Sequence, residues 1–273
     1  MLVPAPSVSV CIPVDRGEPY LAETVRSVLD QTYRDFEVVV LDNASPDRAD
    51  AVARKTGDVR IRVERNPSVV PRAENWNRVV QLSRAPLVKV LRPTDLLHPR
   101  CLELQVAPME TDPGLAVVAA RRHMIDDQSR IVVPRRGLSG LTGVRTGVEV
   151  ARRVVRSRAN PIGEPGSVLF RREDFFAAGG WRSDRPLTMD LDLWMRLLQF
   201  GEFLGLPEPL AAFRANRDFI AEDRRALQEE QDRLLDEIAG TEAFGVRGID
   251  VTVGRLLSPT GRVKRSAMAA AAR

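Results

Sequence analysis

Apolar residues in the first hundred positions fall into two alternating patterns. Short continuous runs rich in β-branched residues have the length of buried strands. Between the runs, segments 20–30 and 72–83 place their apolar side chains on one helical face. The expected strands are Ser7–Ile12, closed by Pro13, then Phe36–Leu41, Arg60–Glu64 and Leu87–Leu91. Strands that alternate with helices predict an α/β fold with a mostly parallel sheet flanked by helices.

The second half of the chain is less regular. Thr146 and Glu149 have the spacing of a capping box, which predicts a helix that runs through Val155. The other expected elements are strands at Leu115–Ala120 and Ser167–Phe170, a loop at Pro134–Thr146, and helices at Asp192–Phe200 and Ile220–Ile238. The last helix is charged with a narrow apolar seam, so it either braces the core or pairs two copies in a homo-oligomer.

Composition excludes some classes of protein. The 273 residues are 44% hydrophobic and 29% charged, a balance that can bury a core, and the net charge is a mild +4. Aromatics are only 5%, which argues against a stacking surface for nucleic acid. Basic clusters at 152–158 and 261–265 are either solvated faces or contacts for phosphate or anionic lipid.

The features that bear on localisation are sparse. Cys11 and Cys101 are too few and too far apart for a metal motif, and they indicate a reducing compartment. The N-terminus lacks a signal-peptide pattern, and no apolar run reaches the length of a membrane span. We expect a cytoplasmic protein, with peripheral contact at the inner face of the membrane left open.

Polar residues follow two of the expected strands. Asp42 opens a turn directly after Phe36–Leu41, and Arg92–Asp95 follows Leu87–Leu91. Ligands of parallel α/β sheets gather at the carboxyl ends of strands, so a binding site is expected here. The alternative role for Asp42 is that of a turn residue that caps the next helix.

Three blocks, residues 7–47, 75–99 and 165–214, together resemble the family 2 glycosyltransferases. The resemblance covers roughly residues 7–214. It implies the GT-A fold, in which a nucleotide-binding sheet is merged with an acceptor-binding half. It also implies a hexosyltransferase-like enzyme that moves sugar from a nucleotide-diphosphate sugar to an acceptor hydroxyl. The acceptor would be a polysaccharide, a lipid-linked glycan or a small molecule.

The resemblance also assigns residues to the nucleotide-sugar. Pro13, Val14 and Asp15, with Asp42 after the next strand, would contact the nucleobase and ribose. Asn77 lies in the block that matches the family's Asn-containing helix. A carboxylate that faces a base can accept its imide or amide N–H.

The metal motif of the family is altered in this chain. Where the family has two acids one residue apart, this chain has Arg92 and Thr94, and Asp95 alone stays acidic. Downstream, Arg214 is followed by Asn216 where the family often has a metal-binding His. Either Asp95 still holds Mg²⁺ or Mn²⁺, or the two arginines grip the phosphates directly. A degenerate enzyme that binds without turnover is a further alternative.

The third block implies the catalytic base. Asp190 occupies the position of the family's base, with Asp192 two residues on. A base that deprotonates the acceptor hydroxyl during one in-line displacement inverts the anomeric centre. The alternative role for both acids is stabilisation of a helix N-terminus. A dinucleotide oxidoreductase is disfavoured because no GxGxxG follows the first strand.

These observations divide the chain into three parts. We expect a GT-A domain over residues 1–215 and an amphipathic helix over 216–240. Residues 241–273 are expected to form a partly flexible tail, since its periodic signals are weak and its end is alanine-rich.

Overall fold

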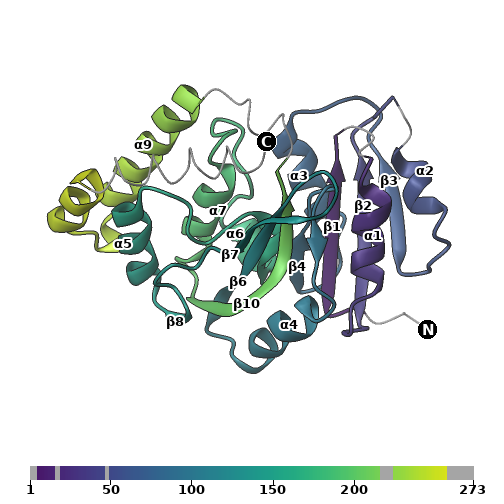
Figure 1. The fold of residues 1–273 in the computed structure, drawn as a ribbon, viewed down its shortest axis with the longest axis horizontal. Coiled ribbons are helices and arrows are strands. Elements are labelled where there is room, and N and C mark those ends of the chain that lie inside the picture. The colour runs from purple at the N-terminus through teal and green to yellow at the C-terminus, as the bar shows by residue number, and fades with distance from the viewer. Residues whose placement is uncertain (1–4, 16–18, 47–48, 216–223, 257–273) are drawn as a thin grey trace.

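The computed structural model describes residues 5–15, 19–46, 49–215 and 224–256. Within them, one ten-stranded sheet runs in the order β3-β2-β1-β4-β9-β6-β10-β5, with β7 beside β6 and β8 beside β10 (Figure 1). The strands are β1 (Val8–Val14), β2 (Phe36–Asp42), β3 (Ile61–Arg65), β4 (Leu87–Val90), β5 (Leu96–Leu97), β6 (Leu115–Ile125), β7 (Ile131–Arg136), β8 (Gly143–Arg145), β9 (Val168–Arg171) and β10 (Glu202–Arg214).

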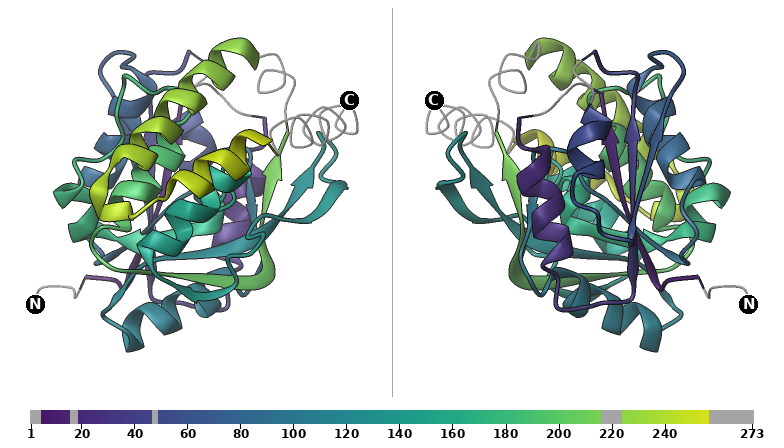
Figure 2. Two further views of the ribbon diagram at one scale, coloured as in Figure 1. Left: turned by 90° about the vertical axis from the view of Figure 1, so that its left-hand side faces the viewer. Right: turned by 90° about the vertical axis from the view of Figure 1, so that its right-hand side faces the viewer.

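Helices cover both faces of this sheet. They are α1 (Leu21–Leu29), α2 (Ala49–Arg54), α3 (Arg72–Gln81), α4 (Cys101–Thr111), α5 (Gly147–Ser157), α6 (Arg172–Ala177), α7 (Met189–Leu197) and α9 (Arg224–Gly240). One apolar core joins the sheet to α1 and α4, and a larger one joins it to α3, α5, α6, α7 and α9. Figure 2 shows α1 and α3 on opposite sides of the sheet. The predicted α/β class is confirmed.

The four strands predicted in the first hundred residues, β1 to β4, form the first parallel part of the sheet. β1 lies between β2 and β4, with Val8 opposite both Phe36 and Leu87. Next to β4, the antiparallel strand β9 links this part to the parallel pair β6 and β10. The carboxyl ends of strands from both parts lie together. Asp95 follows β4, Arg214 ends β10, and the Arg214 backbone N–H donates to the Asp95 carboxylate at 3.1 Å.

Several predicted boundaries were wrong. Pro13 does not close the first strand, because β1 continues to Val14 and pairs with β2 throughout. The segment expected as a loop contains β8 and overlaps β7, which form antiparallel edges on β10 and β6. Helix α7 begins at Met189, so Asp190 lies in its first turn. Turn-rich composition conceals such short edge strands, which pack little apolar surface.

Helix α5 begins as its sequence predicts. The Thr146 side chain accepts a hydrogen bond from the Glu149 N–H at 3.3 Å, and the Glu149 carboxylate accepts one from the Thr146 N–H at 2.8 Å. Arginines of the basic cluster 152–158 are held by the protein itself. Arg156 pairs with Asp250 at 2.5 Å, and Arg158 pairs with Asp232.

The C-terminal helix α9 packs against the body of the protein. Leu234 and Ile238 are buried in the larger core, while Ile220 lies outside the described residues. Figures 1 and 2 show α9 beside α5, at the end of the molecule away from β3. A brace on the core was one of the two predicted roles. Among the described helices, none combines the length and apolarity needed to cross a bilayer.

Candidate functional site

Side-chain amides join the carboxyl ends of β1 and β2. Asp15 accepts hydrogen bonds from Asn43 at 3.0 Å and from Asn75 at 3.1 Å. Asn66 donates to Asn43 and to Asn75, both at 2.9 Å. Asp15 is therefore fixed by α3 and by the turn after β2, at the place expected for the nucleoside. Pro13 and Val14 lie buried in β1 just before it.

Asp42 makes the contacts of a turn residue, which is the alternative role predicted for it. Its carboxylate is fully buried, accepts a hydrogen bond from the Ser45 N–H at 2.9 Å, and pairs with Arg65. These partners order the turn after β2 and place Asn43 beside Asp15. Contact of Asp42 with a nucleobase stays a prediction.

The partly buried Arg92 and the buried Asp95 form an ion pair just after β4. The Arg92 guanidinium donates to both Asp95 carboxylate oxygens, at 3.1 Å and 2.9 Å, and to the Thr94 hydroxyl at 3.2 Å. It also lies 4.2 Å from the Phe213 ring centre. Burial disfavours the charged form of Arg92, but Asp95, Glu164 and Asp190 outweigh it and raise its pKa. The cation is thus fixed in place.

The Arg214 side chain is enclosed by the protein. It donates to the Thr94 carbonyl at 3.0 Å, the Asp126 carbonyl at 2.7 Å and Glu23 at 2.8 Å. None of its surface is exposed. Arg214 therefore holds β10 against the 92–95 turn, and its predicted contact with phosphate would require these bonds to break.

The residues present do not fit a divalent metal ion. Mg²⁺ and Mn²⁺ need free oxygen ligands, and both Asp95 oxygens already accept bonds from Arg92. The Arg92 charge would also repel a cation. Among the described residues, no group of three or more His, Cys, Asp or Glu side chains could hold a metal. Asn216 lies outside the described residues.

Asp190 projects from the first turn of α7. It is partly buried, and its Oδ1 accepts a hydrogen bond from the Trp181 indole N–H at 3.2 Å. Burial raises the pKa of Asp190 to about 7; Glu164 adds to the rise, while Trp181, Arg92 and Arg72 oppose it. A carboxyl group of this pKa can exchange a proton near neutral pH, as a general base must.

Glu164 is a charged neighbour that the sequence did not reveal. Burial would raise the pKa of Glu164, but Arg122 and Arg136 hold it at about 2. Glu164 pairs directly with Arg122 and lies 3.9 Å from Arg136. Its fixed negative charge is one cause of the raised pKa of Asp190.

Asp192 lies in a cluster of arginines. It is buried and pairs with Arg196 at 2.6 Å, with Arg182 at 3.5 Å and Arg185 at 3.8 Å nearby. Stabilisation of the start of α7 was the predicted alternative for this residue.

Asn77 faces away from the amide cluster. Its side chain donates to the Trp181 carbonyl at 2.9 Å and accepts from the Trp181 N–H at 2.8 Å. Its predicted contact with the nucleotide-sugar stays a prediction. The residue of α3 that reaches Asp15 is Asn75, two positions earlier. Asn75 and Asn77 flank the apolar face of Trp76, Val79 and Val80 on opposite sides, so helical spacing alone does not tell them apart.

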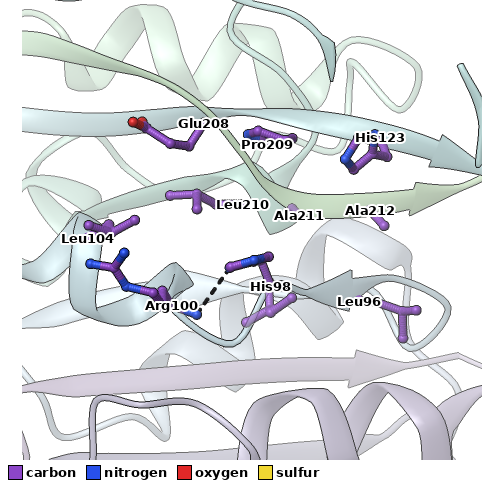
Figure 3. Close-up of a pocket in the computed structure, with 11 residues that line it drawn as sticks. Leu96, His98, Arg100, Leu104, His123, Glu208, Pro209, Leu210, Ala211 and Ala212 are labelled. Atoms are coloured by element: carbon purple, nitrogen blue, oxygen red, sulfur yellow. Dashed lines mark hydrogen bonds between the residues drawn. The ribbon is translucent and has the colours of Figure 1, made fainter. Parts of the chain in front are cut away.

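Two cavities lie outside this cluster. One of about 460 Å³ lies between α4, β5 and β10 and is mostly apolar, with His98 and His123 on its walls (Figure 3). It contains none of the predicted site residues. The other, of about 650 Å³, lies along α3 and is lined by Asn77, Arg78 and Trp181 among others. Trp181 connects this second cavity with Asp190.

The chain belongs to glycosyl transferase family 2, whose family model matches residues 9–176. An uncharacterized protein of Mycobacterium tuberculosis is 30% identical over 218 residues, which cover 77% of this chain and 67% of that protein. The putative glycosyltransferase EpsE of Bacillus subtilis is 26% identical over 235 residues, covering 84% and 80%. The predicted class of enzyme, a glycosyltransferase, is thereby confirmed.

Solved structures agree on the fold. TarS of S. aureus in complex with UDP-GlcNAc superposes with a TM-score of 0.62 at 15% identity, covering 85% of this chain and 71% of that chain. The mannosyltransferase PcManGT from Pyrobaculum calidifontis, in complex with GDP-Man and Mn²⁺, has a TM-score of 0.61 at 15% identity, covering 99% and 86%. The predicted GT-A fold is confirmed.

Proposed function

We propose that this glycosyltransferase transfers a sugar from a nucleotide-diphosphate sugar to an acceptor hydroxyl with inversion, and that Asp190 is its general base. The observation that carries the proposal is the Asp190 carboxyl itself. It lies partly buried at the start of α7, with a pKa raised to about 7 by burial and by Glu164. The acceptor would be a glycan, a lipid-linked glycan or a small molecule.

The proposed step needs one proton transfer. The Asp190 carboxylate takes the proton of the acceptor hydroxyl as that oxygen bonds to the anomeric carbon. The bond between the anomeric carbon and the diphosphate oxygen breaks on the opposite side. The electron pair leaves with the diphosphate, so the anomeric configuration inverts.

We further propose that Arg92 supplies the positive charge for the leaving diphosphate. Its guanidinium carries its charge at any physiological pH, and because Nε and Nη2 donate to Asp95, Nη1 would be the donor to a phosphate oxygen. Arg92 is already fixed by Asp95 and Phe213 at the end of β4. A preorganised charge of this kind stabilises the transition state without reorganisation during the reaction.

The first experiment measures thermal stabilisation by UDP and by GDP, each with Mn²⁺ and with EDTA. A ligand that binds the native state raises its melting temperature by mass action. UDP and GDP are the parent diphosphates of the donors in the TarS and PcManGT complexes. We expect stabilisation by one nucleotide that survives EDTA. Stabilisation that needs Mn²⁺ would contradict the role of Arg92.

The second experiment tests the base. Asp190→Asn should retain nucleotide binding but slow release of the nucleoside diphosphate from UDP-GlcNAc or GDP-Man by about 100-fold or more. Asp192→Asn, checked for folding, is the matched control on the same helix turn. Full activity of Asp190→Asn would refute the assignment, and binding without turnover in the wild type would point to a non-catalytic relative.

A further inference from the structure

The backbone of Trp181 is held on both sides by one side chain. Asn77 accepts from the Trp181 N–H at 2.8 Å and donates to the Trp181 carbonyl at 2.9 Å, although 104 positions separate the two residues. The preceding Gly180 has a φ of +66°, and a Cβ there would lie 2.5 Å from the Asn77 Oδ1. A glycine is therefore required for this close approach.

The indole ring of Trp181 is also fixed. It meets Trp76 edge to face at 5.2 Å between ring centres and lies 5.2 Å from Phe175. Trp181 is buried in the larger core. Neither the backbone nor the ring can turn without loss of these contacts, so the direction of the indole N–H is set by the fold.

That N–H is aimed at the base, at 3.2 Å from the Asp190 Oδ1. We infer that Trp181 is a positioning residue: its indole N–H orients the Asp190 carboxyl, and Asn77 keeps the indole in place. This inference rests on the proposed function for its catalytic meaning. A neutral donor suits the task, because it binds one carboxylate oxygen and leaves the other to accept a proton.

Loss of this bond has a definite electrostatic sign. The groups that act on Asp190 are Glu164, which disfavours its charge, and Arg92 and Arg72, which favour it. The indole N–H of Trp181 also favours the carboxylate over the neutral acid. Removing it should raise the pKa of Asp190, whereas a change in packing alone has no such preferred sign.

The test is a titration of the Asp190 carboxyl by ¹³C NMR in the whole protein labelled at aspartate. The resonance is assigned by its absence from Asp190→Asn. Trp181→Phe keeps an aromatic ring but removes the donor, and we expect it to raise the pKa of Asp190 by about 0.5–1 pH unit. An unchanged or lowered pKa would overturn the inference.

Trp194→Phe is the matched control. Trp194 lies in the same aromatic cluster, 6.4 Å from Trp181 between ring centres, but its indole N–H donates to the Gly163 carbonyl at 2.9 Å. The same substitution there should leave the pKa of Asp190 within about 0.2 pH unit of the wild type. An equal rise in both variants would mean that loosened packing causes it, and would reject the inference.

A second variant covers a failure of Trp181→Phe to fold. Asn77→Ala removes both bonds to the Trp181 backbone and adds no charge near Asp190, so the indole should loosen and the pKa of Asp190 should rise. No change in this variant would refute the role of Asn77. The titration needs no substrate. An unchanged pKa together with an inactive Asp190→Asn would reject the role of Trp181 alone, and a raised pKa together with an active Asp190→Asn would reject the role of Asp190 as base alone. The inference and the proposed function are thus tested separately.

Discussion

Folding places the Asp190 carboxyl where its negative charge is disfavoured. Its pKa is about 7 in the folded protein, against about 4 in an unfolded chain. Between these values the folded state binds more protons than the unfolded state, so the free energy of unfolding falls as pH rises from about 4 to about 7. The cost of ionisation at the site is therefore fully present above pH 7.

Asp190→Asn should remove this cost. We expect the variant to be more stable than the wild type by about 1–2 kcal/mol at pH 8, less than full linkage because the carboxyl is partly exposed. The gain should vanish near pH 4. Urea unfolding at the two pH values measures it. Asp192→Asn should have the opposite sign, since it breaks a buried ion pair with Arg196. Equal losses of stability in both variants would contradict the interpretation.

The residues that replace the metal motif can be exchanged. Arg92→Asp combined with Thr94→Asp restores two acids one residue apart and frees Asp95 from its arginine. We expect Mn²⁺ to strengthen nucleotide binding by this double variant by about tenfold or more, while binding by the wild type stays unchanged. Calorimetric titration with and without Mn²⁺ measures this. Arg92→Ala controls for simple loss of the positive charge. Mn²⁺-dependent nucleotide binding by the wild type would contradict the prediction.

Among the elements, α9 fixes the start of the helix that carries the proposed base. The buried Glu230 accepts from the Leu187 N–H at 3.0 Å, from the Thr188 N–H at 2.7 Å and from the Thr188 hydroxyl at 2.8 Å. Glu237, which lies two turns further along α9, pairs with Arg185 at 2.5 Å. These contacts anchor the chain directly before α7.

Glu230→Ala should destabilise the protein by about 2–3 kcal/mol, because three donors at the start of α7 lose their acceptor. Glu230→Gln keeps an acceptor oxygen and should cost about 1 kcal/mol. Hydrogen exchange should show the loss of protection in the first turn of α7. Glu229→Ala is the control, since Glu229 is exposed and pairs with Arg225 on the same helix. No difference between Glu230→Ala and Glu229→Ala would refute the anchoring role.

Across the molecule, the sequence predicted what depends on continuous apolar runs. β1, β2 and β4 were found because each buries both faces in the sheet. The resemblance pointed to Asp190, whose role as base stays a proposal, but the contacts that raise or lower its pKa join distant parts of the chain. Trp181 is nine positions away, and Glu164 belongs to another loop. Such pairings depend on how α3, α6 and α7 pack, which local periodicity does not encode.

The bond from Glu230 to the start of α7 has a consequence for how the enzyme can be recombined. The family match ends at residue 176, and α9 lies beyond every predicted donor-site residue. A chimera that grafted residues 1–215 onto another transferase would carry the whole proposed chemistry but leave Leu187 and Thr188 without their carboxylate. The part of the chain that must be transferred together is therefore larger than the sequence motifs, and a functional graft should include α9 along with Asp190.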